Sequence, residues 1–218
     1  MNSTAPRRTP TQRRSRERLE RILRAAGELC DELGAATVTM DAIAERAGTS
    51  IGSLYQFFPN RDALLQGIAE RNVRELNAIL DATDDPEVAM LPLPELVEAV
   101  LAPFVDFHEN HPGYFHILFA PQGSEALRSL RGRLRKRLCL RVELLCRFRA
   151  PHIPAVRRRR IALTVVEASR ALMQYIEQGI PAEERAAQRE ELVAMLVAYL
   201  DPWLGGVARE MEGDQRPG

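Results

Sequence analysis

The sequence predicts an all-α fold of about nine helices. Apolar residues recur every three or four positions through most of the chain, and no stretch of useful length alternates as a β-strand does. Pro and Gly divide the chain into segments of helical length. With 218 residues, 45% hydrophobic and 28% charged, the composition is that of a globular protein with one or two cores. No apolar run reaches the roughly 20 residues of a membrane span, so no membrane association is expected.

Residues 39–58 predict two short helices joined by a tight turn. Thr39 suits the N-cap of the first. Gly48 stands where that helix must stop, in a left-handed position that glycine adopts without strain. Thr49 and Ser50 can then cap the next helix. This is the layout of a helix-turn-helix, which places its second helix in the major groove of DNA.

Other helices are expected on both sides of this unit. An upstream helix should end near Gly34, because its apolar residues follow helical spacing at Ile22, Ala25, Ala26, Leu29 and Leu33. Residues 81–94 contain three prolines and predict a loop. The remaining helices are expected at 61–80, 95–110, 114–120, 124–148, 155–178 and 182–209.

The N-terminal part resembles the DNA-binding unit of the tetracycline-repressor (TetR) family of bacterial transcriptional regulators. The resemblance covers about 15–75 and rests on Thr39, Ile43, Ala44, Ala47, Gly48, Gly52, Leu54, Tyr55, Phe58, Arg61, Leu64 and Leu65. It implies a helical regulatory and dimerisation domain at 76–209, between a basic flexible arm at 1–14 and a tail at 210–218. The implied protein is cytoplasmic, reaches the nucleoid through DNA and is not an enzyme.

Phosphate contacts are expected from side chains near the helix starts. Short or rigid hydroxyls suit phosphate oxygens, and the chain offers Thr39, Thr49, Ser53 and Tyr55. Arg61 matches the family's phosphate-contacting basic position, which is usually Lys. Tyr55 has a second interpretation, as a core tyrosine with a hydrated hydroxyl.

Base contacts are expected from the outward face of the second helix of the unit, formed by Ser50, Ile51, Gly52, Ser53 and Gln56. Gln56 can pair with an adenine edge, and Ile51 can touch a thymine methyl group. Gly52 allows close approach of the backbone. Since Ile51 stands where many relatives carry Lys, an apolar readout is expected.

Charge is strongly segregated although the formal net charge is zero. Residues 1–24 contain eight Arg against two Glu, which favours phosphate contact beside the helix-turn-helix. Residues 81–125 carry nine acidic residues and no Lys or Arg. Residues 128–160 carry twelve Arg and one Lys against Glu143. This basic block has two interpretations, a solvated helix face or a second DNA surface.

An effector pocket is a second functional hypothesis. Aromatic residues gather at Phe104, Phe107, His108, Tyr114, Phe115 and Phe119, and polar groups recur along one later helix at Glu167, Arg170 and Gln174. Such a mixture suits a mostly apolar cavity with a few orienting polar groups. The alternative is a packed aromatic core with a polar stripe at the surface.

A homodimer is predicted through residues 155–178 and 182–209. Both helices have apolar residues on more than one face, which requires burial on more than one side. Two copies could meet as a four-helix bundle and read a palindromic site. A monomeric core is the alternative.

The sequence predicts no catalytic site, metal or cofactor. Cys30, Cys139 and Cys146 are scattered and predict inert thiols, although Cys139 and Cys146 could sense oxidants across a dimer. The function expected is a transcriptional regulator, most simply a repressor released from its operator by a small molecule. Other possibilities left open are an activator or protein-gated regulator, a non-specific architectural DNA binder and a helical enzyme.

Overall fold

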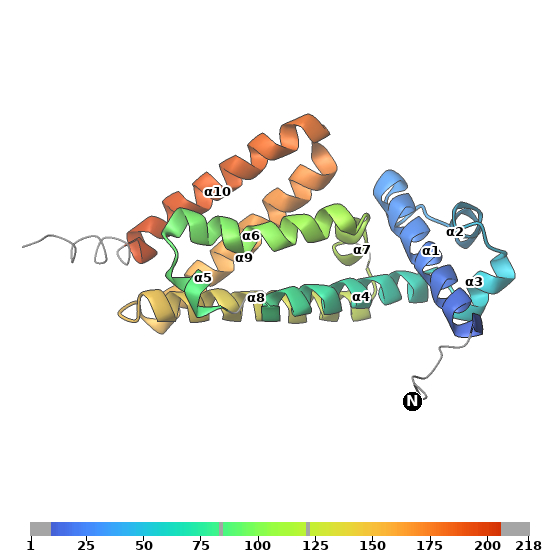
Figure 1. Cartoon of the computed structure of the whole chain (residues 1–218), viewed down its shortest axis with the longest axis horizontal. Helices are drawn as coiled ribbons and strands as arrows, with labels where there is room; N and C mark the ends of the chain where they lie inside the picture. The colour runs from blue at the N-terminus through green and yellow to red at the C-terminus, as the bar shows by residue number, and fades with distance from the viewer. Residues whose placement is uncertain (1–9, 83–84, 121–122, 206–218) are drawn as a thin grey trace, which may run out of the picture. The chain divides into compact units, whose positions relative to one another are not determined.

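The computed structural model describes residues 10–82, 85–120 and 123–205, and all regular structure there is helical (Figure 1). The all-α prediction is confirmed. The helices are α1 (Pro10–Leu33), α2 (Met40–Arg46), α3 (Ile51–Phe57), α4 (Arg61–Ala82), α5 (Pro86–Met90), α6 (Leu93–Asn110), α7 (Tyr114–Leu118), α8 (Glu125–Arg149), α9 (Ala155–Gly179) and α10 (Ala182–Leu204).

The loop predicted at 81–94 is wrong for nine of its residues, because 86–90 form α5, 81–82 end α4 and 93–94 begin α6. Asp85 is the N-cap and its side chain accepts a hydrogen bond from the backbone N–H of Glu87. Pro86 takes the first helical turn, where a missing N–H costs nothing. An Asp-Pro pair can therefore start a helix as well as break one. The described part of the chain thus holds ten helices, one more than expected.

The ends of the first and last helices also differ from expectation. Helix α1 begins at Pro10, inside the segment predicted as a flexible arm. Helix α10 ends at Leu204, and the predicted residues 206–209 lie outside the described residues, as do the tail and residues 1–9 of the arm.

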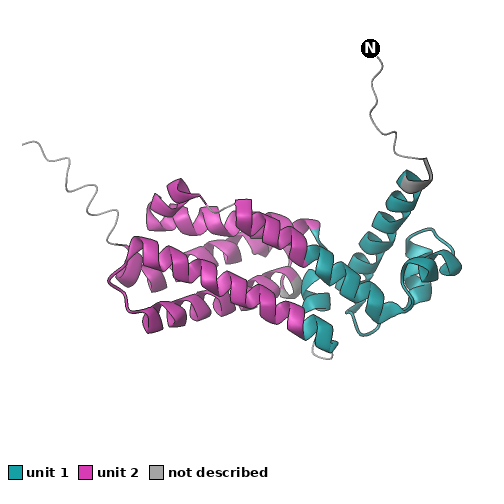
Figure 2. Cartoon of the chain, turned by 90° about the horizontal axis from the view of Figure 1, so that it is seen from below, with its two compact units in different colours: residues 1–72, 111–128 teal, residues 73–110, 129–218 magenta. Residues whose placement is uncertain are grey.

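The chain divides into two compact units (Figure 2). Unit 1 comprises residues 1–72 and 111–128, so a segment from beyond α6 belongs with the helix-turn-helix. Within it, α1 packs against both α2 and α7. The core is built from side chains with 0% exposure, namely Ile22, Ala26, Cys30, Ile43, Leu54 and Leu64.

Helix α1 and the turn before α7 approach so closely that only glycine fits. A Cβ on Gly27 would lie 2.6 Å from the carbonyl oxygen of Pro112. Gly113 has a φ of 75°, and a Cβ there would meet the Gly27 carbonyl and lie 3.1 Å from the Cβ of Cys30. The Gly113 N–H donates to Asp31 Oδ1 at 3.3 Å. This joint fixes α7 to the first helix of the unit.

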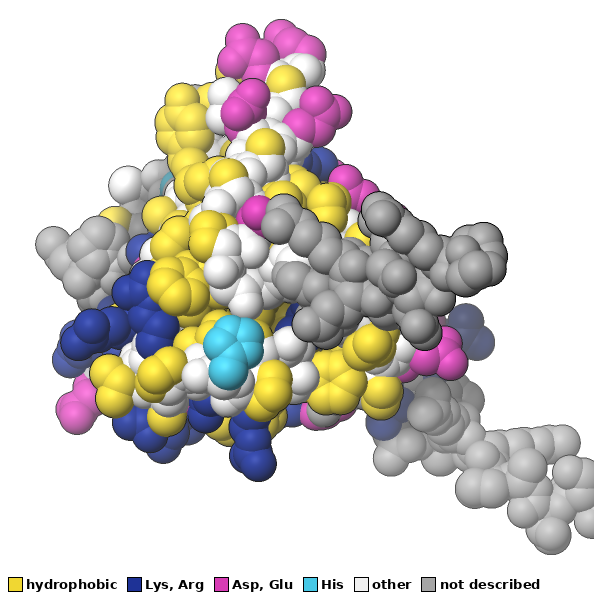
Figure 3. Space-filling view, turned by 90° about the vertical axis from the view of Figure 1, so that its left-hand side faces the viewer, with side chains coloured by type: hydrophobic (Ala, Val, Ile, Leu, Met, Phe, Trp, Pro, Cys, Tyr) yellow, Lys and Arg dark blue, Asp and Glu magenta, His cyan; other side chains and the backbone are white. Residues whose placement is uncertain are grey.

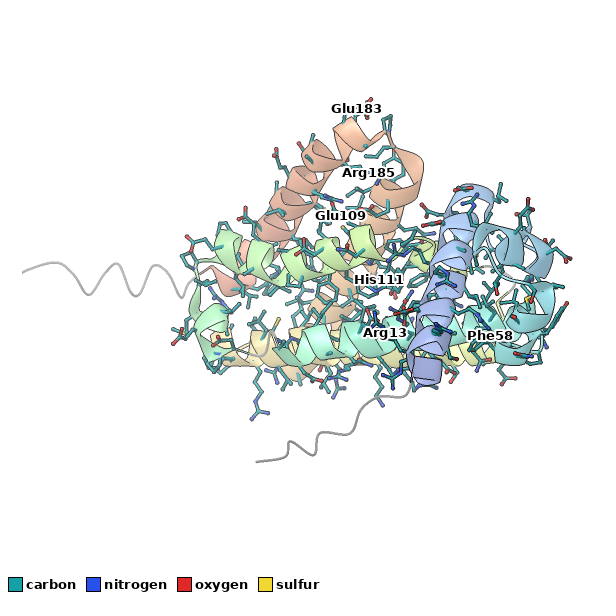
Figure 4. All side chains as sticks on the ribbon, turned by 45° about the vertical axis from the view of Figure 1, so that its right-hand side comes forward. Arg13, Phe58, Glu109, His111, Glu183 and Arg185 are labelled. Atoms are coloured by element: carbon teal, nitrogen blue, oxygen red, sulfur yellow. The ribbon has the colours of Figure 1, made fainter. Side chains whose placement is uncertain are left out.

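Unit 2 comprises residues 73–110 and 129–218, and its helix α10 packs against α6 and α9. Arg189 of α10 joins all three helices, because its guanidinium lies 2.8 Å from both Glu109 of α6 and Glu177 of α9. Arg185 adds a second contact to Glu177 at 3.3 Å. Figure 4 labels Glu109 and Arg185 on this side of the unit.

Arg149, at the end of α8, is 7% exposed and has its charge inside unit 2. Its guanidinium donates to the carbonyls of Ala89 at 2.8 Å, Leu91 at 2.7 Å and Leu204 at 3.4 Å. These carbonyls end α5 and α10, where a helix leaves acceptors unsatisfied. Burial lowers the pKa of Arg149. The side chain thus caps two helices that are far apart in the sequence.

Candidate nucleic-acid interface

The two helices of the helix-turn-helix are capped as predicted. Thr39 Oγ1 accepts from the N–H of Ala42 at 3.2 Å, and Ser50 Oγ accepts from the N–H of Ser53 at 3.2 Å. Gly48 has a φ of 60°, the left-handed conformation expected after α2. The N–H of Thr49 then donates to the carbonyl of Ala44 at 3.0 Å and closes the turn.

Helix α3 is anchored by one side and presents the other to solvent. Leu54 is fully buried, whereas Tyr55 is 51% and Ile51 36% exposed. Gly52 and Gln56 are also exposed. A core position for Tyr55, the alternative interpretation, is therefore wrong. Figure 4 labels Phe58, which follows α3 in unit 1.

Three of the predicted contact residues are less accessible than the rest, namely Thr49, Ser53 and Arg61. Ser53 is half-buried, and its hydroxyl pairs with that of Ser50 at 2.9 Å. Thr49 is half-buried in the turn. The outward face is thus made mainly by Ile51, Gly52, Tyr55 and Gln56, and exposed Thr39 stands at the start of α2.

Arg61 has a partner that the sequence did not reveal. Its Nη1 donates to the carbonyl of Ala36 at 2.8 Å and lies 3.5 Å from that of Val38, and its Nη2 lies 3.4 Å from Asp62 Oδ1. The guanidinium therefore holds the segment between α1 and α2. No local sequence signal predicts a contact over 25 positions.

Two cations that were assigned to the flexible arm, Arg13 and Arg14, stand on helix α1. Arg13, Arg14 and Arg16 are exposed, and Arg13 pairs with Glu17 at 2.8 Å, one helical turn away. A helix holds these charges in fixed register beside the helix-turn-helix. Pro10 is the signal that could have located this helix start.

Most of the basic block is engaged within unit 2. Arg137 pairs with Asp81, Arg141 donates to the carbonyl of Leu80, and Arg157 lies 4.2 Å from the centre of the Trp203 ring. Of these three contacts, only that of Arg137 is to an opposite charge. Because Arg133, Lys136 and Arg147 are exposed, the second DNA surface stays a prediction.

The residues predicted for an effector pocket divide between the units. In unit 1, Tyr114 packs edge-on against Phe115 with ring centres 5.0 Å apart, and Phe119 lies 5.8 Å from Phe115. Tyr114 and Phe115 are buried and Phe119 is half-buried. An aromatic cluster therefore forms beside α1.

The other six predicted pocket residues belong to unit 2. Phe104, Phe107 and His108 lie on α6, where Phe107 is buried and its ring centre is 5.6 Å from that of His108. On α9, Arg170 bonds both Glu167 at 3.0 Å and Gln174 at 3.2 Å, which makes one half-buried polar ladder.

Burial makes the thiols of Cys30 and Cys146 poor nucleophiles. It raises the pKa of Cys30 from 9.0 to about 12 and that of Cys146 to about 11. The pKa of half-buried Cys139 is raised as well, again through burial. All three are therefore protonated near neutral pH.

Among the helices of the described ranges, none combines the length and the apolar composition that a membrane span requires.

Two family descriptions match separate parts of the chain. Residues 22–68 match "Bacterial regulatory proteins, tetR family", and residues 92–200 match "Tetracyclin repressor-like, C-terminal domain". The first match contains the helix-turn-helix, and the second covers half of the chain.

Curated relatives match over part of the chain. The nucleoid occlusion factor SlmA of Glaesserella parasuis is 29% identical over 104 residues, 47% of this chain and 50% of that protein. The transcriptional repressor KstR of Mycolicibacterium smegmatis is 38% identical over 66 residues, 30% of this chain and 32% of that protein. The chain thus spans about half, or less, of the length of these relatives.

Solved structures match over most of the chain. A TetR-family regulator from Streptomyces coelicolor is 26% identical with a TM-score of 0.57, and the match covers 87% of this chain and 99% of that one. The SmeT–triclosan complex shares the fold at 22% identity and a TM-score of 0.58, over 87% and 93% of the two chains. The chain therefore belongs to the TetR family of bacterial transcriptional regulators.

Proposed function

We propose that the chain is a sequence-specific repressor that binds a palindromic operator as a homodimer and leaves it when a small molecule binds. The observation that carries this proposal is the outward face of α3. It exposes Ile51, Gly52, Tyr55 and Gln56 on a helix whose start, turn and buried side are all fixed. A rigid helix with an adaptable polar and apolar face suits the major groove.

The proposed contacts divide into positioning and reading. Thr39, Thr49, Ser53 and Tyr55 supply hydroxyls for phosphate oxygens, which set the register of the helix. Gln56 reads an adenine edge, Ile51 touches a thymine methyl group, and exposed Ser50 belongs to the same reading face.

Arg61 has two possible roles that one experiment separates. In one role, the guanidinium leaves the Ala36 carbonyl to bind phosphate. Arg61→Ala then makes the fall of log K for DNA binding with log salt concentration less steep, by about 0.9. If it only supports the segment between α1 and α2, the variant loses stability and keeps the slope. The proposal predicts the smaller slope, with Arg61→Lys restoring it.

The proposed dimer uses α9 and α10. Their outer faces expose Leu163, Tyr175 and Met195 by 48%, 53% and 40%, next to small exposed residues such as Ala171 and Ala194. Small residues allow two helices to approach closely. A four-helix bundle of two copies would bury these side chains about a two-fold axis.

The proposed effector is a mostly apolar small molecule. The aromatic clusters on α6 and α7 and the polar ladder on α9 supply groups of the required kind. SmeT, a protein of the same fold, forms a complex with triclosan, and another protein of this fold is a gamma-butyrolactone receptor, which supports this class of ligand. Ligand would release DNA by favouring a state in which the two recognition helices are wrongly spaced.

Capture of genomic fragments tests the proposal. Footprinting of the captured DNA should give two protected half-sites about one helical turn apart, even with excess competitor DNA. Apolar compounds are then screened for release of that fragment. Uniform protection without half-sites would contradict sequence-specific binding, and would favour an architectural role in the bacterial cytosol.

A further inference from the structure

The exposed face of α8 carries a row of large apolar side chains. Leu140, Leu144 and Phe148 recur every four residues and are 54%, 53% and 55% exposed. Each step of four residues turns the helix by about 40°, so the three side chains lie within an arc of about 80° on one face. These three side chains are called the apolar row below.

Cations surround the apolar row on the same face. Arg133, Lys136 and Arg147 are exposed and lie within about 40° of its arc around the helix axis. Among the described residues, none of these three cations is paired with a carboxylate. Glu143 is the only acidic residue of α8 beyond its first turn, and it lies toward α9, 3.8 Å from Arg159. Figure 3 faces the end of unit 2 with the α8–α9 turn and shows hydrophobic side chains directly beside Lys and Arg.

Contacts to two neighbouring helices fix the orientation of this face. Arg137 pairs with Asp81 of α4, and Arg141 donates to a backbone carbonyl of the same helix. On its other side, α8 is held by Arg135, which lies 3.6 Å from Glu167 of α9. Rotation of the apolar row away from solvent would break these contacts. The row is therefore a fixed surface feature of unit 2, and a contiguous exposed apolar surface of this kind marks an interaction site.

The chemistry of the face distinguishes between the surfaces that could cover it. Duplex DNA would pair with the cations, but its phosphate backbone offers little apolar surface to three large side chains. The same face of a second copy would bring like charges together. An anionic bilayer would satisfy both the charge and the apolar side chains, but it requires no regular spacing of them. A spacing of four residues forms the ridge by which one α-helix packs into the grooves of another.

We propose that the exposed face of α8 docks an acidic amphipathic helix of another protein. Apolar side chains of that helix, three or four residues apart, would pack along the apolar row. Glu or Asp residues beside them would pair with Arg133, Lys136 and Arg147. The apolar row is about 12 Å long, so a partner helix of about three turns would cover it. This contact adds a protein partner to the proposed regulator and does not depend on operator or effector binding.

Selection from a displayed library of helices of about five turns identifies the partner chemistry that the chain prefers. Leu is fixed at positions three and four residues apart in every library member, and each remaining position is Glu, Lys, Gln or Ala. The full chain serves as bait. The retained helices should be enriched in Glu over Lys. Retention of no helix, or enrichment of Lys, would overturn the proposal.

The apolar row is tested with a selected acidic peptide and the variant Leu144→Asn. The Kd for the peptide should rise by about tenfold or more, because the central apolar anchor is lost without a change in charge. Leu33→Asn is the matched control, since Leu33 is 55% exposed on α1, and it should leave the Kd unchanged. Circular dichroism verifies that both variants remain helical. An unchanged Kd for Leu144→Asn would show that the peptide binds elsewhere and that the proposal is wrong.

The cations are tested through the salt dependence of peptide binding. Arg147→Gln should weaken binding and make the fall of affinity with salt concentration less steep, because one charge pair is lost. Arg14→Gln removes an exposed cation of α1 instead and should change neither quantity. Identical salt dependence for Arg147→Gln and the unmodified chain would contradict the proposed charge pairing.

Three further titrations reveal whether a different surface covers the face. Phosphatidylglycerol vesicles and a duplex of random sequence replace the peptide, and sedimentation equilibrium follows self-association. Leu144→Asn should leave all three unchanged. Loss of vesicle binding in this variant would make the face a membrane contact, loss of duplex binding a DNA contact, and dissociation of a dimer a contact between copies. Each of these results would refute an acidic helix as the partner.

Discussion

At the scale of single residues, Gly52 has no role in the folded chain that requires glycine. It lies on the exposed face of α3, and a Cβ there would meet nothing within 4 Å. Its φ is not in the left-handed region. Glycine within a helix costs about 0.5–1 kcal/mol relative to alanine. Glycine at position 52 therefore makes the fold less stable than alanine would. Close approach of DNA to this position would explain why glycine is present.

Gly52→Ala is therefore expected to stabilise the fold by about 0.5–1 kcal/mol and to weaken operator binding. Chemical denaturation and equilibrium titration with operator DNA measure the two effects. Gly132→Ala on α8 is the control, because a Cβ at that exposed position also meets nothing. It should stabilise the fold to a similar extent and leave DNA affinity unchanged. Unaltered DNA binding by Gly52→Ala would show that this face does not contact DNA closely.

Single residues also mark the limit of sequence interpretation. The caps at Thr39, Ser50 and Asn60 were predictable, because each bonds a backbone N–H within three positions. The bonds of Arg61 and Arg149 were not, since their carbonyl partners lie 23 to 60 positions away. Local chemistry can be inferred from local sequence, whereas a contact between distant segments depends on the fold.

At the scale of elements, α1 and the turn before α7 lie so close together that neither Gly27 nor Gly113 has room for a Cβ. The sequence predicted both helices but not their association, because the glycines responsible are 86 positions apart, at Gly27 and Gly113. Helix α7 also contains part of the aromatic cluster proposed to sense effector. The joint therefore connects α7 to α1, the first helix of the unit that holds the helix-turn-helix.

Gly113→Ala should destabilise unit 1 by more than the conformational cost alone. Gly34→Ala supplies the comparison, because Gly34 has a φ of 78° and open space around it, whereas Gly113 has a φ of 75° and faces α1. The left-handed conformation costs about 1–2 kcal/mol for a side chain other than glycine. Denaturation midpoints should show this loss for Gly34→Ala and a larger one for Gly113→Ala. Equal losses would mean that α1 and α7 separate easily.

At the scale of the whole molecule, buried thiols make stability depend on alkaline pH. The folded chain holds the pKa of Cys30 at about 12 and that of Cys146 at about 11, whereas an exposed thiol has 9.0. Above pH 9 the unfolded chain releases these protons and the folded chain keeps them. Ionisation of the thiols then favours unfolding. The contribution of the buried, protonated thiols to the free energy of unfolding is therefore complete below pH 9 and is lost as the pH rises through their folded pKa values.

The expected slope is a loss of at most about 1.4 kcal/mol per pH unit for each thiol between pH 9 and 11. Urea denaturation at intervals of pH measures it. Cys30→Ala lowers stability at every pH by opening a cavity, but its profile above pH 9 should be flatter. Parallel profiles for the two proteins would contradict the assignment to Cys30.

The family of the protein was readable from residues 39–65, while its assembly and ligand were not. Dimerisation and effector binding depend on surfaces built by several helices, and aromatic residues of the predicted pocket fall in two different units. An open groove between α6 and α10 contains none of the nine predicted pocket residues. Composition alone identified the types of side chain present and could not place them together.

The most direct test of the central claim is selection of bound sequences from a random duplex pool at near-physiological salt, done in parallel with the unmodified chain and with Gln56→Ala. Sequence reading by α3 predicts an enriched palindrome for the unmodified chain and a changed preference at one base pair of each half-site for the variant, because Gln56 reads an adenine edge. DNA recovered without a consensus, or an identical palindrome from both proteins, would contradict sequence reading by the outward face of α3.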